Sequence, residues 1–109
     1  MVLETINNSH PQVATTITLT TPIVGACPMS GEPQAGSTIR VTYQPQDKLI
    51  ELHSIEKYLK ALSTGEEALD LETVVQLVFL ACKEIHISAS VEGNYKLRNG
   101  LEMVCRCES

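Results

Sequence analysis

Alternation of apolar and polar side chains predicts two strands in the first half of the chain. Residues 13–20 read VATTITLT, and residues 39–43 read IRVTY. Because β-branched residues at alternate positions are typical of strands, we expect both segments to be strands, with residues 49–52 as a brief continuation of the second. The stretch between them is rich in glycine and proline and predicts a long turn.

The spacing of apolar positions then changes from a period of two residues to a period of about 3.6, which predicts two helices. Ser54 is a suitable N-cap for a helix over residues 55–62, whose apolar side chains recur at i, i+3, i+4 and i+7. A polar loop at residues 63–67 precedes Asp70, which can cap a second helix that runs to about residue 83. The second helix is apolar over a wide arc, so we expect it to be well buried.

Two further strands are predicted after the helices. Residues 85–92 and 101–108 return to a period of two. The Gly-Asn and Asn-Gly pairs at residues 93–94 and 99–100 are expected to bracket the loop of a hairpin. The order β-β-α-α-β-β predicts an α+β fold, in which an antiparallel sheet carries two helices on one face.

Composition and charge narrow the range of functions. A chain of 109 residues is expected to form a single domain, covering residues 1–109. The net charge of −5 argues against a free-standing nucleic-acid-binding protein, although a ring can assemble basic patches locally. Residues 1–12 contain no apolar run or basic leader, and no stretch reaches the ~20 apolar residues of a membrane span. We therefore expect a cytoplasmic protein with no membrane partner, whose four cysteines are reduced thiols.

Three of these cysteines lie on apolar faces of predicted elements and are expected to pack in the core: Cys82, Cys105 and Cys107. Cys105 and Cys107 share one strand face and would need His53 or His86 to complete a metal site. No CxxC pair is present and the spacing defines no ligand geometry, so no metal site is predicted. His86 is expected at the surface, on the polar face of its strand.

Cys27 lies outside every periodic segment, in the sequence CPMSGEPQ of residues 27–34. Pro28 and Pro33 restrict the backbone, and Gly31 permits a tight turn. A rigid turn presents a thiolate to a ligand at a small ordering cost. Cys27 is therefore the candidate nucleophile.

The segment CPMSGEPQAGSTIRVTYQP, followed by LIELHSIEKYL, resembles the QueF-type nitrile reductases, which have the tunnelling fold. The similarity runs from about residue 27 to residue 83, and the last two strands fit in outline. It implies that Cys27 attacks the nitrile carbon of 7-cyano-7-deazaguanine and forms a covalent thioimide. In the family, NADPH reduces this intermediate to the aminomethyl compound, on the way to queuosine in tRNA. Ser30 occupies the serine or threonine position of the motif and is expected to contribute to substrate binding.

The resemblance also implies a glutamate at the start of the second helix, which binds the guanine-like edge of the base. Glu72 is at this position, with Asp70 as the alternative, and Leu71 replaces the histidine that usually precedes the glutamate. A carboxylate suits this role because it can accept hydrogen bonds from an N–H and an exocyclic amine. The helix dipole alone also favours an acid in a first turn, so both interpretations of Glu72 stay open.

Gln34 departs from the pattern of the reductases. They carry an aspartate here, which acts as the general acid. An amide can donate a hydrogen bond and polarise a nitrile, but it cannot deliver a proton. We expect thioimide formation to survive this change with the help of water, and proton delivery during reduction to suffer.

The cofactor motif departs as well. Its two lysines are replaced by His53 and Glu56, although two other lysines follow within four residues. Because NADPH is strongly anionic, a glutamate in place of a cation adds repulsion. The predicted cofactor-binding residues are Glu51, His53 and Ser54.

The sequence is compatible with three functions. The first is a nitrile-acting enzyme of 7-deazaguanine metabolism with NADPH. The second is an archaeosine-type enzyme that adds ammonia to the nitrile in tRNA without NADPH. Such relatives also keep an acidic residue after the cysteine, so Gln34 departs from their pattern too. The third is a non-catalytic ring protein that binds a purine-like ligand. The acidic charge favours a free base over tRNA as the substrate, and the resemblance implies a homo-oligomer of pentameric rings, often paired.

Overall fold

The structure is a computed structural model that describes residues 3–64 and 69–108. In chain order, its elements are β1 (Thr5–Asn7), β2 (Ile17–Pro22), β3 (Thr38–Tyr43), β4 (Lys48–Ile50), α1 (Leu52–Ser63), α2 (Leu71–Glu84), β5 (Ala89–Lys96), the 3-10 helix η1 (Arg98–Gly100) and β6 (Glu102–Cys107). The predicted polar loop at residues 63–67 lies largely outside the described residues. No helix in the described part of the chain is both long and apolar enough to cross a membrane.

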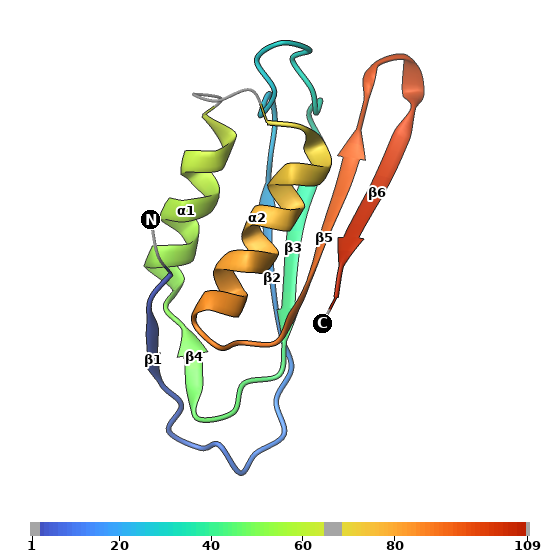
Figure 1. The fold of residues 1–109 in the computed structure, drawn as a ribbon. Helices are drawn as coiled ribbons and strands as arrows, with labels where there is room; N and C mark the ends of the chain where they lie inside the picture. Colours follow the sequence, from blue (N-terminus) through green and yellow to red (C-terminus); the bar gives the residue numbers. More distant parts are fainter. Residues whose placement is uncertain (1–2, 65–68, 109) are drawn as a thin grey trace.

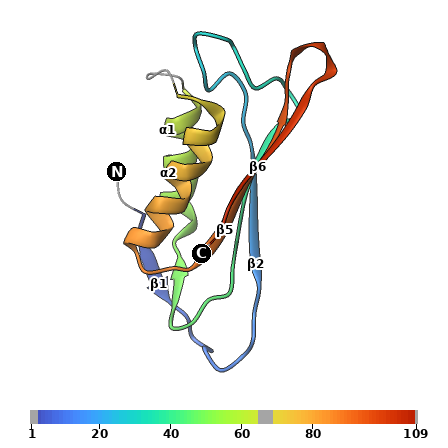
Figure 2. The ribbon, with the colours of Figure 1, turned by 45° about the vertical axis from the view of Figure 1, so that its right-hand side comes forward.

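The main sheet carries both helices on one face. Its four antiparallel strands lie in the order β2-β3-β5-β6, and α1 and α2 run across the same side (Figure 1 and Figure 2). The predicted α+β class is confirmed, and the arrangement is compatible with the tunnelling fold. Among the residues described, β2 and β6 are the edges of this sheet.

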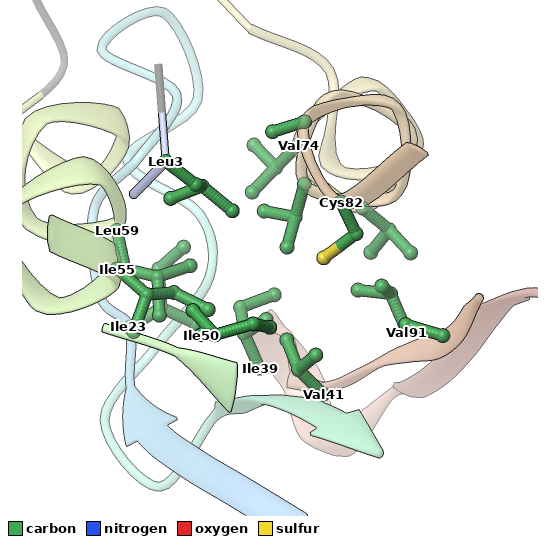
Figure 3. Close-up of a cluster of buried hydrophobic side chains, with 14 of the residues drawn as sticks. Leu3, Ile23, Ile39, Val41, Ile50, Ile55, Leu59, Val74, Cys82 and Val91 are labelled. Atoms are coloured by element: carbon green, nitrogen blue, oxygen red, sulfur yellow. The ribbon is translucent and has the colours of Figure 1, made fainter. Parts of the chain in front are cut away.

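The core lies between the helices and the sheet. Val41 of β3 lies opposite Val91 of β5, and both side chains are fully buried. Val74 and Cys82 of α2 are buried against the same layer, and Figure 3 shows the Cys82 sulfur directed from α2 into the apolar cluster. Each of these valines contributes roughly 1.5–3 kcal/mol by its removal from water, so this layer holds α2 on the sheet.

The first strand starts later than predicted. β2 begins at Ile17 and extends to Pro22. In the register of the β2–β3 pair, Ile17 lies opposite Tyr43, the last residue of β3. Residues 13–16 therefore have no partner on β3, and their alternation does not produce a strand.

Residues 49–52 do not continue β3 as predicted. Lys48–Ile50 forms β4, which pairs with β1 in a separate two-stranded antiparallel sheet. Strands of three residues are too short to show an alternation, so this pair could not be predicted from the sequence. Leu52 belongs to α1.

Glu51, not the predicted Ser54, is the N-cap of the first helix. The Glu51 carboxylate accepts hydrogen bonds from the N–H groups of His53 (3.1 Å) and Ser54 (2.5 Å). The Ser54 hydroxyl donates to the Glu51 carbonyl at 2.8 Å and accepts from the N–H of Glu4 at 3.0 Å. The carboxylate thus satisfies two free N–H groups of the first turn, and the helix starts three residues earlier than predicted.

The third predicted strand is displaced by four residues. β5 spans Ala89–Lys96 rather than residues 85–92, because Ile85 ends α2 and His86 turns the chain with a φ of 60°. The Gly-Asn pair at residues 93–94 therefore lies inside β5, paired with β6, and not in the hairpin loop. His86 is exposed as predicted, but it lies in the turn and not on a strand face.

The second helix starts where it was predicted to start. Asp70 occupies the N-cap position, and the helix continues to Glu84. The Asp70 side chain makes no capping hydrogen bond to this helix. Its carboxylate is therefore not used to hold the helix in place.

Tyr43→Phe is expected to destabilise the fold by about 1–2 kcal/mol. The Tyr43 hydroxyl accepts a buried 3.0 Å hydrogen bond from the N–H of Ile50, and its loss leaves that N–H unpaired. Urea unfolding measures the change. Tyr58→Phe is the matched control. The Tyr58 hydroxyl donates to the carbonyl of Leu77 at 3.2 Å. This carbonyl lies inside α2, where it also accepts a hydrogen bond from the helix backbone, so the loss of the hydroxyl does not leave it unpaired. An equal loss of stability in the two variants would contradict the expectation.

Candidate active site

Three segments that are distant in the sequence meet at one end of the main sheet. They are the loop between β2 and β3, the start of α2, and the hairpin between β5 and β6. Figure 1 shows all three at the upper end of the molecule, and Figure 2 shows the same grouping from a second direction. The predicted catalytic and substrate-binding residues that belong to these segments are Cys27, Ser30, Gln34, Asp70 and Glu72.

Backbone hydrogen bonds close the loop at Cys27 into a tight turn. The N–H of Cys27 donates to the carbonyl of Glu32 at 2.9 Å, and the N–H of Gly31 donates to the carbonyl of Cys27 at 2.7 Å. Gly31 has a φ of 74°, a conformation that glycine adopts at little cost. The turn therefore holds Cys27 by both of its backbone polar groups.

The turn favours the ionised form of the Cys27 thiol. The hydrogen bond from the Ser30 side chain is the main cause that lowers the pKa of Cys27, and backbone hydrogen bonds at Ser30 and Met29 add to it. The Ser30 hydroxyl also accepts a 3.2 Å hydrogen bond from the N–H of Glu32, which leaves its hydrogen for the sulfur. Because Cys27 is only partly covered, a ligand can reach this thiolate.

Cys82 and Cys105 are less reactive by the same criterion. Cys82 is buried, as predicted, and burial raises its pKa to about 11. Burial, followed by the charges of Cys107 and Glu72, raises the pKa of Cys105. Within residues 3–64 and 69–108, no group of three or more histidine, cysteine or acidic side chains is placed to hold a metal ion. Of the three thiols compared, Cys27 is thus the one whose surroundings favour the thiolate.

Alkylation should report this difference directly. We expect iodoacetamide to modify Cys27 at a lower pH than Cys82 or Cys105, because the thiolate reacts and a lowered pKa supplies it at lower pH. Ser30→Ala should move the pH profile of Cys27 upward and leave the profiles of the other two unchanged. Peptide mass spectrometry after timed alkylation measures all profiles in one sample. A Cys27 profile that stays in place in Ser30→Ala would contradict the assigned hydrogen bond.

The Gln34 amide is fixed by its neighbour Glu32. Its Nε2 donates to the Glu32 carboxylate and, at 3.4 Å, to the carbonyl of Gly31. The Gln34 hydrogen bond, followed by the N–H and the charge of Arg98, lowers the pKa of Glu32. Because the side-chain N–H groups of Gln34 are engaged in this way, its side-chain oxygen is the atom that can contact a ligand. The hydrogen bonds to Glu32 favour the ionised form of its carboxylate.

The same turn is attached to the hairpin between β5 and β6. The N–H of Gln34 donates to the carbonyl of Lys96 at 2.8 Å, and Arg98 donates its N–H to Glu32 at 3.0 Å. Buried Ser37 bridges the two segments, since its hydroxyl donates to the Gln34 carbonyl at 2.8 Å and accepts from the N–H of Lys96 at 2.7 Å. Sequence reasoning missed Glu32, Ser37 and Arg98. For Glu32, the available signal was the presence of a carboxylate two residues before Gln34.

Asp70 and Glu72 act on different neighbours from the start of α2. Ser30 lowers the pKa of Cys27, and the charge of Asp70 opposes that effect. Burial raises the pKa of Tyr95, with a smaller contribution from the charge of Glu72. Both carboxylates belong to exposed residues. The charge of Asp70 thus acts on the Cys27 thiol, whereas the charge of Glu72 acts on Tyr95 of β5.

The predicted cofactor-binding residues lie at the opposite end of the fold. Glu51, His53 and Ser54 are at the start of α1, whose 12 residues span ~18 Å. Figure 1 shows this start next to β4, at the lower end of the helix. The side chains of Glu51 and Ser54 are hydrogen-bonded within the helix start. Within one chain, the structure does not bring these residues to Cys27.

A groove of about 640 Å³ lies between α1 and the edge strand β2. Glu56 and Lys60 are its charged lining residues, and apolar side chains of α1, including Leu52 and Ile55, line it as well. Because the two charges have opposite signs, the groove offers no net positive charge to a phosphate group.

No protein-family model matches the chain. Over 59 residues, 39% of positions are identical to the NADPH-dependent 7-cyano-7-deazaguanine reductase of Syntrophobacter fumaroxidans (strain DSM 10017 / MPOB). The aligned stretch covers 53% of this chain and 37% of that relative. The chain thus has a distant, partial similarity to a reductase of that name. The aligned stretch covers well under half of the reductase's own length.

Proposed function

We propose that the chain captures 7-cyano-7-deazaguanine through its nitrile. The Cys27 sulfur adds to the nitrile carbon, the nitrogen gains a proton, and the product is a covalent thioimide. The observation that carries this proposal is a partly exposed thiol whose pKa is lowered by hydrogen bonds on a closed turn. The partial similarity to a protein named as a reductase of this nitrile supports the choice of substrate.

The residues around Cys27 suit a guanine-like base. In this proposal Glu72 accepts hydrogen bonds from the N–H and amino groups of the base, with Ser30 close to the reacting sulfur. A carboxylate at the start of a helix is suited to such a paired contact. The free thiol requires a reducing compartment, for which the cytoplasm is the proposed location.

NADPH-dependent reduction to the aminomethyl compound, in queuosine biosynthesis, is the proposed fate of the thioimide. Two observations favour a second candidate, in which the chain captures the nitrile but does not reduce it. Gln34 supplies no acid, and Glu56 stands where the cofactor motif has a cation. In that case the thioimide is consumed by ammonia to give an amidine on tRNA, or the chain binds the purine without turnover.

We propose that several copies of this domain assemble as a ring. β2 and β6 are unpaired edges among the described residues, and pairing of the β6 edge of one copy with the β2 edge of the next would cover both. A neighbouring copy could also bring the start of its α1 toward Cys27. Analytical ultracentrifugation at micromolar concentration tests the assembly, and a monomer would contradict it.

Intact mass spectrometry of the wild-type protein with 7-cyano-7-deazaguanine, without NADPH, tests the proposed capture. The expected result is an increase by the mass of the ligand. NADPH is then added to the same sample. Oxidation of NADPH with release of the adduct identifies a reductase, and an adduct that persists favours the second candidate. No adduct with excess ligand would remove the covalent mechanism.

A further inference from the structure

We propose that Asp70 carries the proton for thioimide formation, in place of the acid that position 34 lacks. This inference rests on the proposed capture of a nitrile by Cys27. It assigns Asp70 a role in the reaction, and not the alternative role of binding the base.

The position of Asp70 in the fold is the first support. It lies 43 positions after Cys27 in the chain, yet the start of α2 and the loop between β2 and β3 are side by side in both views (Figure 1 and Figure 2). The Ser30 hydrogen bond lowers the pKa of the Cys27 thiol, and the charge of Asp70 acts in the opposite direction.

The freedom of the Asp70 side chain is the second support. An aspartate at an N-cap position normally accepts a hydrogen bond from the first turn, but Asp70 makes no such bond. Its side chain is exposed, and no ion pair of the described residues includes it. The carboxylate is thus available to a proton and a ligand.

The two other candidates for this role are occupied. The amide of Gln34 holds no transferable proton, and its Nε2 is engaged by Glu32 and Gly31. Glu32 accepts hydrogen bonds from Gln34 and from the N–H of Arg98. Both contacts favour the ionised carboxylate, so Glu32 holds its proton poorly.

The chemical step balances with Asp70 as the carrier. The proton of the Cys27 thiol passes to the Asp70 carboxylate, and the sulfur forms a bond to the nitrile carbon. One π bond of the nitrile breaks, and its electron pair takes the proton from Asp70, which gives the C=N–H group of the thioimide. Asp70 returns to its ionised state, and no oxidant or reductant is consumed.

The test is the rate of adduct formation in Asp70→Asn, followed by intact mass spectrometry with 7-cyano-7-deazaguanine. We expect a rate about 100-fold below wild type, with partial recovery in Asp70→Glu. If Asp70 acted through its charge alone, the rate of adduct formation should instead increase in Asp70→Asn, because the loss of this charge increases the thiolate fraction of Cys27. Asp47→Asn is the matched control, because Asp47 is an exposed aspartate in the loop between β3 and β4, at the other end of the molecule (Figure 1).

A binding measurement separates proton transfer from recognition of the base. Calorimetry with the same nitrile compares Cys27→Ala with the double variant Cys27→Ala/Asp70→Asn, in which no adduct can form. Equal affinities support the proposal. A loss of affinity that matches the loss of rate would make Asp70 a binding residue and overturn it. An unchanged or faster rate in Asp70→Asn, beside a wild-type adduct, would overturn this inference alone, whereas no adduct in the wild type would overturn the proposed capture as well.

Discussion

Cys27→Ala is expected to abolish the covalent adduct with 7-cyano-7-deazaguanine completely. The adduct requires a thiolate, and the hydrogen bonds that lower the pKa of this thiol act on Cys27 and not on the more deeply packed cysteines. Intact mass spectrometry with excess ligand shows the result as the absence of a mass increase. The unfolding free energy should change by about 0.5 kcal/mol or less, because Cys27 is a partly exposed residue on a turn.

Cys107→Ala is the matched control for this variant. Cys107 is also partly exposed, but it lies on β6 and its side chain is not assigned to the site. The control should form the adduct at the wild-type rate. An adduct of equal yield in Cys27→Ala would show that another nucleophile is modified, and it would exclude the turn as the reactive centre.

Gly93→Ala is expected to destabilise the fold by about 2–3 kcal/mol. A Cβ at Gly93 would lie 2.6 Å from the ring and 2.7 Å from the hydroxyl oxygen of Tyr95, and 2.8 Å from a methyl group of Val75. All three groups are in the core, and the Tyr95 hydroxyl donates a 2.7 Å hydrogen bond to the carbonyl of Leu71 at the start of α2. The added methyl group therefore displaces both the ring and the first turn of the helix. Urea unfolding of the purified variant measures the loss.

A double-mutant cycle identifies the cause of this loss. If Gly93→Ala acts mainly through the Tyr95 ring, its effect should be clearly smaller in a Tyr95→Leu background, where the ring carbon and the hydroxyl are absent. Some loss should remain, because Val75 is still close. The same cost in both backgrounds would contradict the proposed clash.

The class of the fold was predictable because long periodic segments dominate it. The alternation at residues 39–43 and the helical pattern after Asp70 match β3 and α2 closely, and both elements are buried in the core. The ends of other elements depended on partners that the sequence does not show. β2 starts where β3 ends, and the start of α1 is set by a carboxylate at Glu51 rather than by the hydroxyl at Ser54.

The candidate site was predictable in part. The spacing of proline, serine and glycine after Cys27 indicated a rigid turn, and the structure shows a turn there. The contact of Glu32 with Gln34 and the attachment to the hairpin at Arg98 depend on which side chains meet after folding. Sequence spacing carries no information about such contacts.

The attachment of the Cys27 turn to β5 has a consequence for the order of folding. β3 and β5 pair residues as distant as Thr38 and Asn94, so both helices are synthesised before this ladder can close. Closing so long a segment is slow compared with forming a local hairpin such as β2–β3. The bonds from Gln34 and Ser37 to Lys96 can form only after that closure. A nascent or partly folded chain therefore carries Cys27 without these restraints, and the anchored turn is completed late, together with the centre of the sheet.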